Sequence, residues 1–361
     1  EMGGGAFYTN GDIYHWDKTL IEGLDRRDTS IRMLDQCRIG PILTGDKTDL
    51  MDGPPVNAML VQNTNPAVVA PETTKVLEGL SRDDLFFCVH EQFMTDTALY
   101  ADILLPATTF VEHNDIYQAG GHQHIILGPR LIEPVGQSRS NHRVVRDLAN
   151  RLGATHRGFE MTEEEIIDDT LKTSGWGDID KLRNNNWIDC QPSFEASHFL
   201  NGFPNKDGKF RFSPNWSAQG PNHTELPDLP DHVDLIEKTD EAHPFRLVTA
   251  PSHNYLNTSF TETATSTEKE VRPTVKLCSA DAAANNFKEG NRVKVGNHRG
   301  EIIVHVEVGN AQQTGIAVIE GIWPNKSFEN GIGVNALIGA DAGPPNGGGV
   351  FHDAAVWIKA S

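Results

Sequence analysis

The sequence contains little cysteine. Its 361 residues include four, which lie far apart and form no Cys-x-x-Cys pair: Cys37, Cys88, Cys190 and Cys278. Zinc and iron–sulfur motifs need closely spaced ligands, so the sequence excludes a local site of either kind. Scattered cysteines are typical of buried thiols in a reducing compartment, which predicts a cytoplasmic location.

Positive charge is also scarce. The chain carries 31 Lys and Arg residues against 50 Asp and Glu residues, which gives a formal net charge of −19. Proteins bind nucleic acid by neutralising its phosphates with basic side chains, so this balance predicts no nucleic-acid partner. It also disfavours an anionic membrane surface. We interpret the acidic surface as a source of solubility.

Long apolar runs are missing as well. No stretch of about eighteen apolar residues occurs, so we expect no membrane span. Residues 1–5 have neither the basic start nor the apolar stretch of a signal peptide. They are typical of an internal glycine turn, and we therefore expect the chain to be a fragment, a split subunit or part of a longer protein.

What the chain does contain begins in residues 57–107. Two short apolar runs, 58–61 and 85–89, flank a helical pattern that begins near Pro71. Proline suits the first turn of a helix, where its missing N–H is not needed. Short apolar runs that do not alternate are typical of strands covered on both faces. The pattern predicts a βαβ unit of a parallel sheet, with residues 104–107 as a third strand.

Polar side chains follow the first two strands. Residues 62–66 and 90–97 are rich in amide, hydroxyl and carboxylate groups. Ligands of open parallel sheets bind beyond the carboxyl ends of the strands. These loops therefore suit a ligand such as a purine, a ribose or a pterin. We also expect a short helix over residues 95–100, capped by Thr95 or Asp96, whose first amides could bind a diphosphate.

The rest of the chain divides into two parts. Residues 155–244 are irregular and polar, apart from a short helix that begins at a capping box of Thr162 and Glu165, and they predict a connecting surface segment. Residues 245–361 contain several short alternating strands with glycine turns, including a hairpin around residues 297–300, which predict a β-barrel. The predicted fold class is α/β: a parallel-sheet domain over residues 1–154, followed by this C-terminal barrel.

We interpret two further patterns mainly as structural features. Four apolar residues mark an amphipathic helix that ends at Gly153, with a role in packing: Val144, Val145, Leu148 and Leu152. Four histidines could line a ligand or metal site, but no close third ligand completes one, and we interpret them mainly as surface, packing or cofactor-lining residues: His15, His113, His122 and His124.

Two segments carry a family resemblance. The sequences QNTNP, at residues 62–66, and EQFMTDTALYADILLPATTFVEHNDIYQ, at residues 91–118, resemble the dimethyl-sulfoxide-reductase family of molybdopterin oxidoreductases. That family includes formate dehydrogenases, periplasmic nitrate reductases and biotin sulfoxide reductases. The resemblance covers nearly the whole chain, but only the C-terminal part of a full-length member.

The resemblance implies a cofactor, bis(molybdopterin guanine dinucleotide) with molybdenum or tungsten, and a dinucleotide-binding role for the barrel. By family position it assigns cofactor contacts to Asn63, Asn65, Pro66, Glu91, Gln92, Phe93, Thr95, Asp96, Asp102, Ser252, His253, Asn254, Asn257, Asn335 and Phe351. The chain departs from many relatives at residues 120–124, which read Gly-Gly-His-Gln-His where an Asn and a Gly-Arg pair are common.

The family's metal ligand and its frequent [4Fe–4S] cluster come from an N-terminal half that this sequence does not show. The resemblance therefore implies an oxidoreductase that is incomplete in this chain alone. Its partners would be its own N-terminal half or a companion subunit, an electron-transfer partner, and a small-molecule substrate such as formate, nitrate or an S- or N-oxide. Two alternatives stay open: a non-catalytic subunit that keeps the fold without the metal, and a sugar- or nucleotide-binding α/β module.

Overall fold

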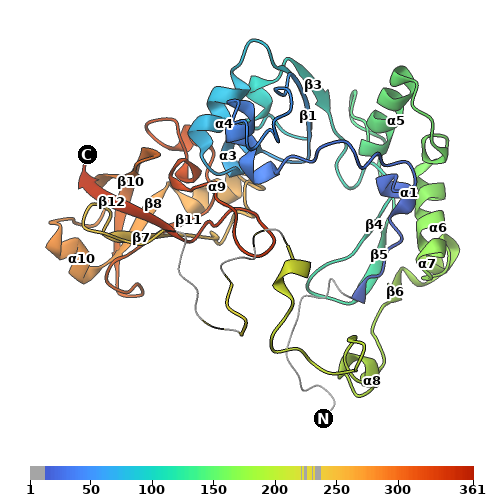
Figure 1. Ribbon diagram of the computed structural model, residues 1–361. Helices are drawn as coiled ribbons and strands as arrows, with labels where there is room; N and C mark the ends of the chain where they lie inside the picture. The colour runs from blue at the N-terminus through green and yellow to red at the C-terminus, as the bar shows by residue number, and fades with distance from the viewer. Residues whose placement is uncertain (1–12, 221, 223–225, 230, 232–236) are drawn as a thin grey trace. The chain divides into compact units, whose positions relative to one another are not determined.

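The computed structural model describes residues 13–220, 222, 226–229, 231 and 237–361 (Figure 1). The turn expected within residues 1–5 lies outside these residues. The chain forms two compact units: unit 1 combines Glu1–Ile31 with Leu105–Arg211, and unit 2 combines Arg32–Leu104 with Phe212–Ser361. The domain boundaries at residues 154 and 244 stay predictions.

Unit 2 contains the predicted βαβ unit. Its strands β1 and β2 pair in parallel, in register from Ala58 opposite Phe86 to Gln62 opposite His90, and β3 is the third strand in the order β1-β2-β3. The parallel sheet predicted from the two apolar runs is therefore confirmed. The elements of this part are α2 (Ile39–Leu43), β1 (Ala58–Gln62), α3 (Pro66–Val69), α4 (Thr73–Leu80), β2 (Phe86–Glu91) and β3 (Ile103–Pro106).

One face of this sheet is covered, and the other is covered only at its carboxyl end, where His90 is buried. Val61 and Phe87 point to a core that includes Val76 of α4. On the opposite face, Leu60 is 38% exposed and Phe86 is 56% exposed. Strands of parallel sheets are normally buried on both faces. The expectation of two covered faces is thus met on one face only by the residues that the structure describes.

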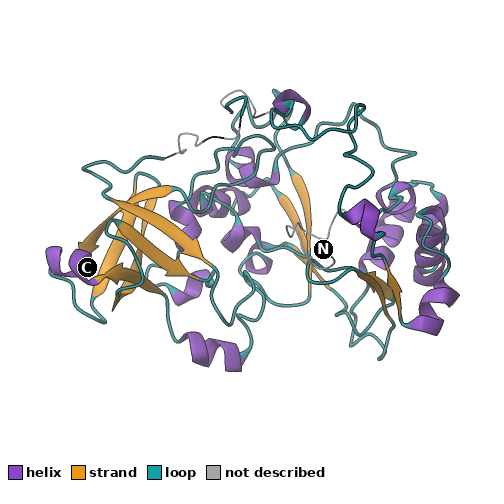
Figure 2. Ribbon diagram, turned by 90° about the horizontal axis from the view of Figure 1, so that it is seen from below, coloured by secondary structure: helices purple, strands orange, loops and turns teal. Residues whose placement is uncertain are grey.

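The second part of unit 2 is a closed barrel with the strand order β10-β8-β11-β7-β12-β9 (Figure 2). Side chains of alternate residues fill it, as Ile302, Val304 and Val306 show in β10. The predicted barrel and its hairpin between β9 and β10 are confirmed. The elements are β7 (Phe245–Ala250), α9 (Ala264–Glu270), β8 (Thr274–Cys278), α10 (Ser279–Ala284), β9 (Arg292–Asn297), β10 (Gly300–Gly309), β11 (Ile316–Glu320) and β12 (Ala354–Ala360).

The barrel also contains a strand that the sequence did not reveal. In β8 only Val275 and Leu277 alternate inward before the strand ends at Cys278, which is too short a pattern to recognise alone. This strand pairs in parallel with β10, and β7 pairs in parallel with β11. The barrel therefore is not a simple succession of hairpins.

Unit 1 packs helices against an antiparallel sheet of order β4-β5-β6. Leu171, Leu182 and Ile188 lie in its buried core. Beyond the short helix that begins at Thr162, residues 155–244 are predicted to be irregular, and this part of the prediction is wrong, because two further helices and a strand lie within residues 179–197. The elements of unit 1 are α1 (Thr19–Glu22), β4 (Asp115–Tyr117), β5 (His124–Gly128), α5 (Asn141–Leu152), α6 (Glu163–Thr173), α7 (Ile179–Asn185), β6 (Trp187–Asp189) and α8 (Phe194–Ser197).

The predicted helix ends in unit 1 are correct. Thr162 and Glu165 form the capping box of α6, and Gly153 ends α5 with a φ of 72°. The packing role expected for α5 holds for Val144, which is buried. It fails for the three other apolar residues of the pattern, whose exposed fractions range from 41% to 75%: Val145, Leu148 and Leu152. Among the described residues, no helix is long and apolar enough to cross a bilayer.

Candidate functional site

The candidate site lies in unit 2, where the loops that follow β1 and β2 are tied together. The Asn65 side-chain oxygen accepts hydrogen bonds from the Thr97 backbone N–H, at 3.1 Å, and the Thr97 hydroxyl, at 2.7 Å. The Thr97 hydroxyl oxygen in turn accepts from the Ala67 N–H at 3.0 Å. Asn63 has a φ of 56°, a left-handed conformation that asparagine tolerates better than most residues. These contacts fix both polar loops at one edge of the sheet.

A segment of the barrel closes against the same loops through Asn325. The buried amide of Asn325 donates to the Ala67 carbonyl at 2.9 Å, and its backbone N–H donates to the Asp96 carboxylate at 3.1 Å. Its side-chain oxygen accepts from the Gly333 N–H at 2.8 Å, which holds the barrel loop itself in place. The strand-end loops and the barrel loop are therefore joined at Asn325.

Asn335 makes a second connection of this kind. Its side-chain amide donates to the carbonyls of Val68, at 2.9 Å, and Val69, at 3.0 Å. Helix α3 has four residues, so its last carbonyls have no partner within the helix. Asn325 bonds the Ala67 carbonyl, and Asn335 bonds the carbonyls of Val68 and Val69. Two asparagine side chains from the barrel therefore cap the end of α3. This capping explains structurally why both amides are buried.

Two half-buried carboxylates lie at the end of β2 and in the loop after it. Burial raises the pKa of Glu91, and hydrogen bonds from the backbone of Gln92 and Phe93 oppose this shift. Burial also raises the pKa of Asp96, against the effect of the Asn325 N–H and the charge of Lys326. The negative charge of Glu262 raises the pKa of both groups further. The loop thus holds carboxylates at a partly dry position, where a hydrogen-bond donor of a ligand would interact strongly.

The loop after β7 lies at the matching edge of the barrel. Because β7 and β11 are parallel, with Ala250 opposite Glu320, the loops that follow them are neighbours. The Ser252 hydroxyl accepts from the Tyr255 N–H at 3.1 Å. Gly321 has a φ of 81°, and a Cβ there would lie 3.0 Å from the Ser252 Cβ, so the close approach requires glycine.

Glu262 connects this loop to the two carboxylates. Its negative charge raises the pKa of Glu91 and Asp96. Burial raises the pKa of Tyr255, and the charge of Glu262 raises it further. Tyr255 packs edge to face on Trp323, with ring centroids 5.1 Å apart. Unit 2 therefore brings the predicted loops after β1, β2 and β7 into one region.

The predicted site residues fall into two groups. Five lie exposed on these loops: Asn63, Gln92, Phe93, His253 and Asn257. Asp102 is also exposed, and it lies directly before β3. Most of the others hold the fold, since Thr95 caps the Ala98 N–H, Asp102 accepts from the Phe87 N–H at 2.7 Å, and Asn254 donates to Glu270. Pro66 begins α3, and Phe351 packs against the barrel core. Their contacts with a cofactor stay predictions.

Sequence reasoning missed Asn325, Lys326 and Glu262. Asn325 lies in a short turn, η6 (Asn325–Ser327), and no periodic pattern marks it; the preceding Pro324 was the one local signal. The helix expected over residues 95–100 is only a 3-10 turn, η3 (Ala98–Tyr100). A turn of three residues has few aligned peptides, so the helix from which the diphosphate contact was predicted is absent there, and the contact itself stays a prediction.

The candidate metal ligands do not come together. His122 and His124 have ring centroids 5.7 Å apart, but among the described residues no group of three His, Cys, Asp or Glu side chains could hold a metal ion. His15 is exposed, and its carbonyl accepts from the Trp176 ring N–H. Burial raises the pKa of the Cys190 thiol, which disfavours the thiolate that a metal would need.

Comparisons with known proteins agree with this architecture. Residues 45–151 match the family described as "Molybdopterin oxidoreductase", and residues 245–355 match the "Molydopterin dinucleotide binding domain". The fold is similar to "Acetylene Hydratase from Pelobacter acetylenicus", with a TM-score of 0.71 and 16% identity over 89% of this chain and 46% of that chain.

Two curated relatives extend the match. The chain is 32% identical to "Probable oxidoreductase YoaE" of Bacillus subtilis, over 99% of this chain and 52% of that protein. It is 26% identical to the "Dimethyl sulfoxide/trimethylamine N-oxide reductase" of Rhodobacter capsulatus, over 73% of this chain and 35% of that protein. The chain spans about half the length, or less, of these relatives. The two matched families and these relatives show that the chain belongs to the dimethyl-sulfoxide-reductase family of molybdopterin oxidoreductases.

Proposed function

We propose that this chain is the C-terminal cofactor-binding portion of a molybdenum or tungsten oxidoreductase. It binds molybdopterin guanine dinucleotide, in the pairwise form that carries the metal, at the loops after β1, β2 and β7. The observation that carries the proposal is the meeting of these loops with the barrel at Asn325, beside the half-buried carboxylates Glu91 and Asp96.

The residues at this site suit such a ligand. The edge of guanine presents N–H donors, and carboxylates accept hydrogen bonds from them. Glu91 and Asp96 are the acceptors that we assign to this role, with exposed amide groups from Asn63 and Gln92 beside them. Partial burial strengthens such bonds. The bound cofactor supplies the electron transfer, and the residues of this chain bind and orient it.

Among substrates we favour an S- or N-oxide over formate or nitrate. The support is the similarity to relatives whose names state that chemistry, which include the Rhodobacter capsulatus enzyme and the "Trimethylamine-N-oxide reductase" of Haemophilus influenzae, 25% identical over 75% of this chain. A [4Fe–4S] cluster and the protein ligand of the metal would come from the completing half. The free thiols of the chain support a reducing, cytoplasmic location.

The β1-β2-β3 sheet of this chain offers a surface that the completing half or companion subunit could cover. The β1-β2-β3 sheet leaves Leu60 and Phe86 exposed on a face that parallel sheets normally bury. The chain also spans only 52% of the length of YoaE, so that relative has a further portion of similar size. We assign the uncovered face to a helical layer from this further portion.

Cofactor content tests the proposal. The chain, co-expressed with the polypeptide that completes its length in a host that makes the molybdenum cofactor, is purified and hydrolysed with acid. Mass spectrometry then measures molybdenum and tungsten, and chromatography measures the released GMP. We expect metal and GMP in fixed proportion, with less GMP in Glu91→Gln, because the amide loses one acceptor and adds a donor.

Glu78→Gln is the matched control, since Glu78 is exposed on α4 and outside the site. It should leave the GMP content unchanged. Absence of both metal and GMP from the purified complex would refute the proposed function. GMP without metal would instead support the alternative of a non-catalytic subunit that keeps the fold.

A further inference from the structure

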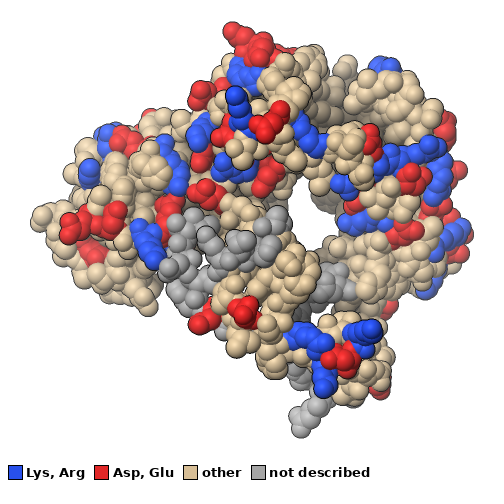
Figure 3. All heavy atoms as spheres, in the orientation of Figure 1, with Lys and Arg blue, Asp and Glu red and all other residues tan. Residues whose placement is uncertain are grey.

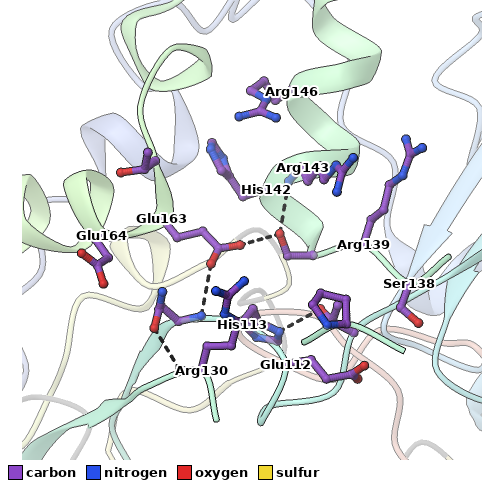
Figure 4. Close-up of a pocket in the computed structure, with 15 residues that line it drawn as sticks. Glu112, His113, Arg130, Ser138, Arg139, His142, Arg143, Arg146, Glu163 and Glu164 are labelled. Carbon is purple, nitrogen blue, oxygen red and sulfur yellow. Dashed lines mark hydrogen bonds between the residues drawn. The ribbon is translucent and has the colours of Figure 1, made fainter. Parts of the chain in front are cut away.

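A separate pocket of about 400 Å³ lies entirely within unit 1. Its wall combines the segment from Thr108 to Asn114 with residues 130–140 and with the first turns of α5 and α6. In Figure 4, Arg143 and Arg146 lie above Glu163 and His113. The function proposed above uses none of these residues.

The pocket gathers more guanidinium groups than carboxylates can bind. Arg139, Arg143 and Arg146 share the single carboxylate of Asp147, at 3.0, 4.0 and 3.9 Å. A charge-assisted hydrogen bond needs about 2.7–2.9 Å. Among the described residues, Arg143 and Arg146 therefore approach a carboxylate only beyond hydrogen-bond distance. A fourth lining arginine, Arg130, pairs with an exposed glutamate at the rim.

The acidic residues of the pocket bond to other groups. The Glu163 carboxylate accepts from the Ser140 hydroxyl at 2.6 Å and from the Asn114 N–H at 3.1 Å. The two other lining glutamates also have partners. Glu112 accepts hydrogen bonds from the backbone N–H groups of residues 109 and 135, and Glu164 forms an ion pair with Arg183 at 2.8 Å. These carboxylates consequently do not satisfy Arg143 and Arg146.

Two helix starts add to the positive potential. Helices α5 and α6, of 12 and 11 residues, begin at the pocket, and their capping residues Ser140 and Thr162 line it. The N-terminus of a helix carries partial positive charge and favours anions. Figure 3 shows Lys and Arg side chains, among acidic ones, over the region of α5 to α7. Such a cationic hollow is unexpected in a chain with a net charge of −19.

We infer that this pocket binds the phosphate group of a small phosphate ester. Arg143 and Arg146 hold the phosphate oxygens, since the planar guanidinium matches them with paired hydrogen bonds. The volume of about 400 Å³ exceeds the need of a lone ion and is within the range of sites for small organic ligands. All residues that line the pocket belong to unit 1, whereas the residues that we assign to the cofactor belong to unit 2.

Titration of the complete chain with inorganic phosphate and with ribose 5-phosphate tests the inference. Isothermal calorimetry in chloride of matched ionic strength measures both affinities. We expect saturable binding of both probes, tighter for the ester, and a loss of about tenfold or more in Arg146→Gln, as expected for one charge-assisted contact.

Arg151→Gln is the matched control. It removes the same charge from the same helix, but Arg151 does not line the pocket and instead bonds the Asp147 carbonyl at 2.9 Å. We expect less than a twofold change in that variant. Equal losses in both variants, or phosphate heats no larger than those of chloride, would overturn the inference. Binding of free phosphate without any preference for the ester would also overturn it. The GMP content of either variant should stay that of the wild type.

Discussion

Asn335 provides the sharpest test of how unit 2 is held together. Its amide, only 1% exposed, donates to the carbonyls of Val68 and Val69 at the end of α3. Asn335→Leu keeps a similar side-chain volume but removes both donors. Val68 is 2% exposed, so its carbonyl would stay dry at a cost of about 1–3 kcal/mol. Val69 is partly exposed, so water can bond its carbonyl in place of the Asn335 amide, and the loss of that hydrogen bond costs about 1 kcal/mol.

The free energy of unfolding should therefore fall by about 2–4 kcal/mol, on the scale of individual hydrogen bonds. Urea denaturation followed by circular dichroism measures the change, and hydrogen exchange of the peptide over residues 66–70 locates it at α3. Asn330→Leu is the matched control, because Asn330 is exposed and donates to one carbonyl, that of Glu301. We expect that variant to lose less than about 1 kcal/mol.

Asn335→Asp separates the loss of the two hydrogen bonds from the change in side-chain shape that Asn335→Leu also makes. It keeps the shape of the side chain but sets a carboxylate against two carbonyl oxygens. The variant should be at least as unstable as Asn335→Leu. If Asn335→Asp retains wild-type stability, the capping of α3 by this amide contributes nothing, and the reasoning is refuted.

Three further predictions concern the same unit. Burial raises the pKa of Asp96 in the folded state, so its stabilising contribution is largest below its unfolded pKa of about 3.9 and is lost as the pH rises through the higher folded pKa. Asp96→Asn keeps an acceptor for the Asn325 N–H but cannot ionise. The urea midpoint of this variant should therefore decline less between about pH 4 and about pH 7 than the urea midpoint of the wild type. An equal decline in both proteins would contradict this prediction. Cys88 is half-buried beside Leu60 on the uncovered face of the sheet. Maleimide should label it faster in the isolated chain than in the complex with the completing half, and equal rates would place the partner elsewhere. Asn65→Leu removes the acceptor of the Thr97 N–H and should lower stability by about 1–3 kcal/mol together with GMP loading. If Thr97→Val reduces loading equally, Asn65 acts by holding the loop and not by touching the ligand.

The local elements can be predicted from the sequence. Apolar runs without alternation indicated β1 and β2, the alternation around residues 297–300 indicated the hairpin, and Thr162 with Glu165 indicated the start of α6. Each of these rests on neighbours within a few residues, where side-chain period, capping and turn chemistry act directly. The two loop signatures likewise indicated the family correctly.

The partners of the site residues, in contrast, depend on the tertiary fold. Asn325 bonds Ala67 across 258 positions, and Asn335 bonds Val68 across 267. No local pattern encodes such pairings, because they depend on how the barrel packs against the strand-end loops. For the same reason the parallel pairing of β8 in the barrel and the helices α7 and α8, which follow the predicted α6, are not evident from the sequence. Asn335 illustrates the difference. Its family position predicts a ligand contact, which stays a prediction, and only the fold shows that its buried amide bonds two carbonyls of α3, since a buried amide must bond whatever carbonyls the fold brings to it.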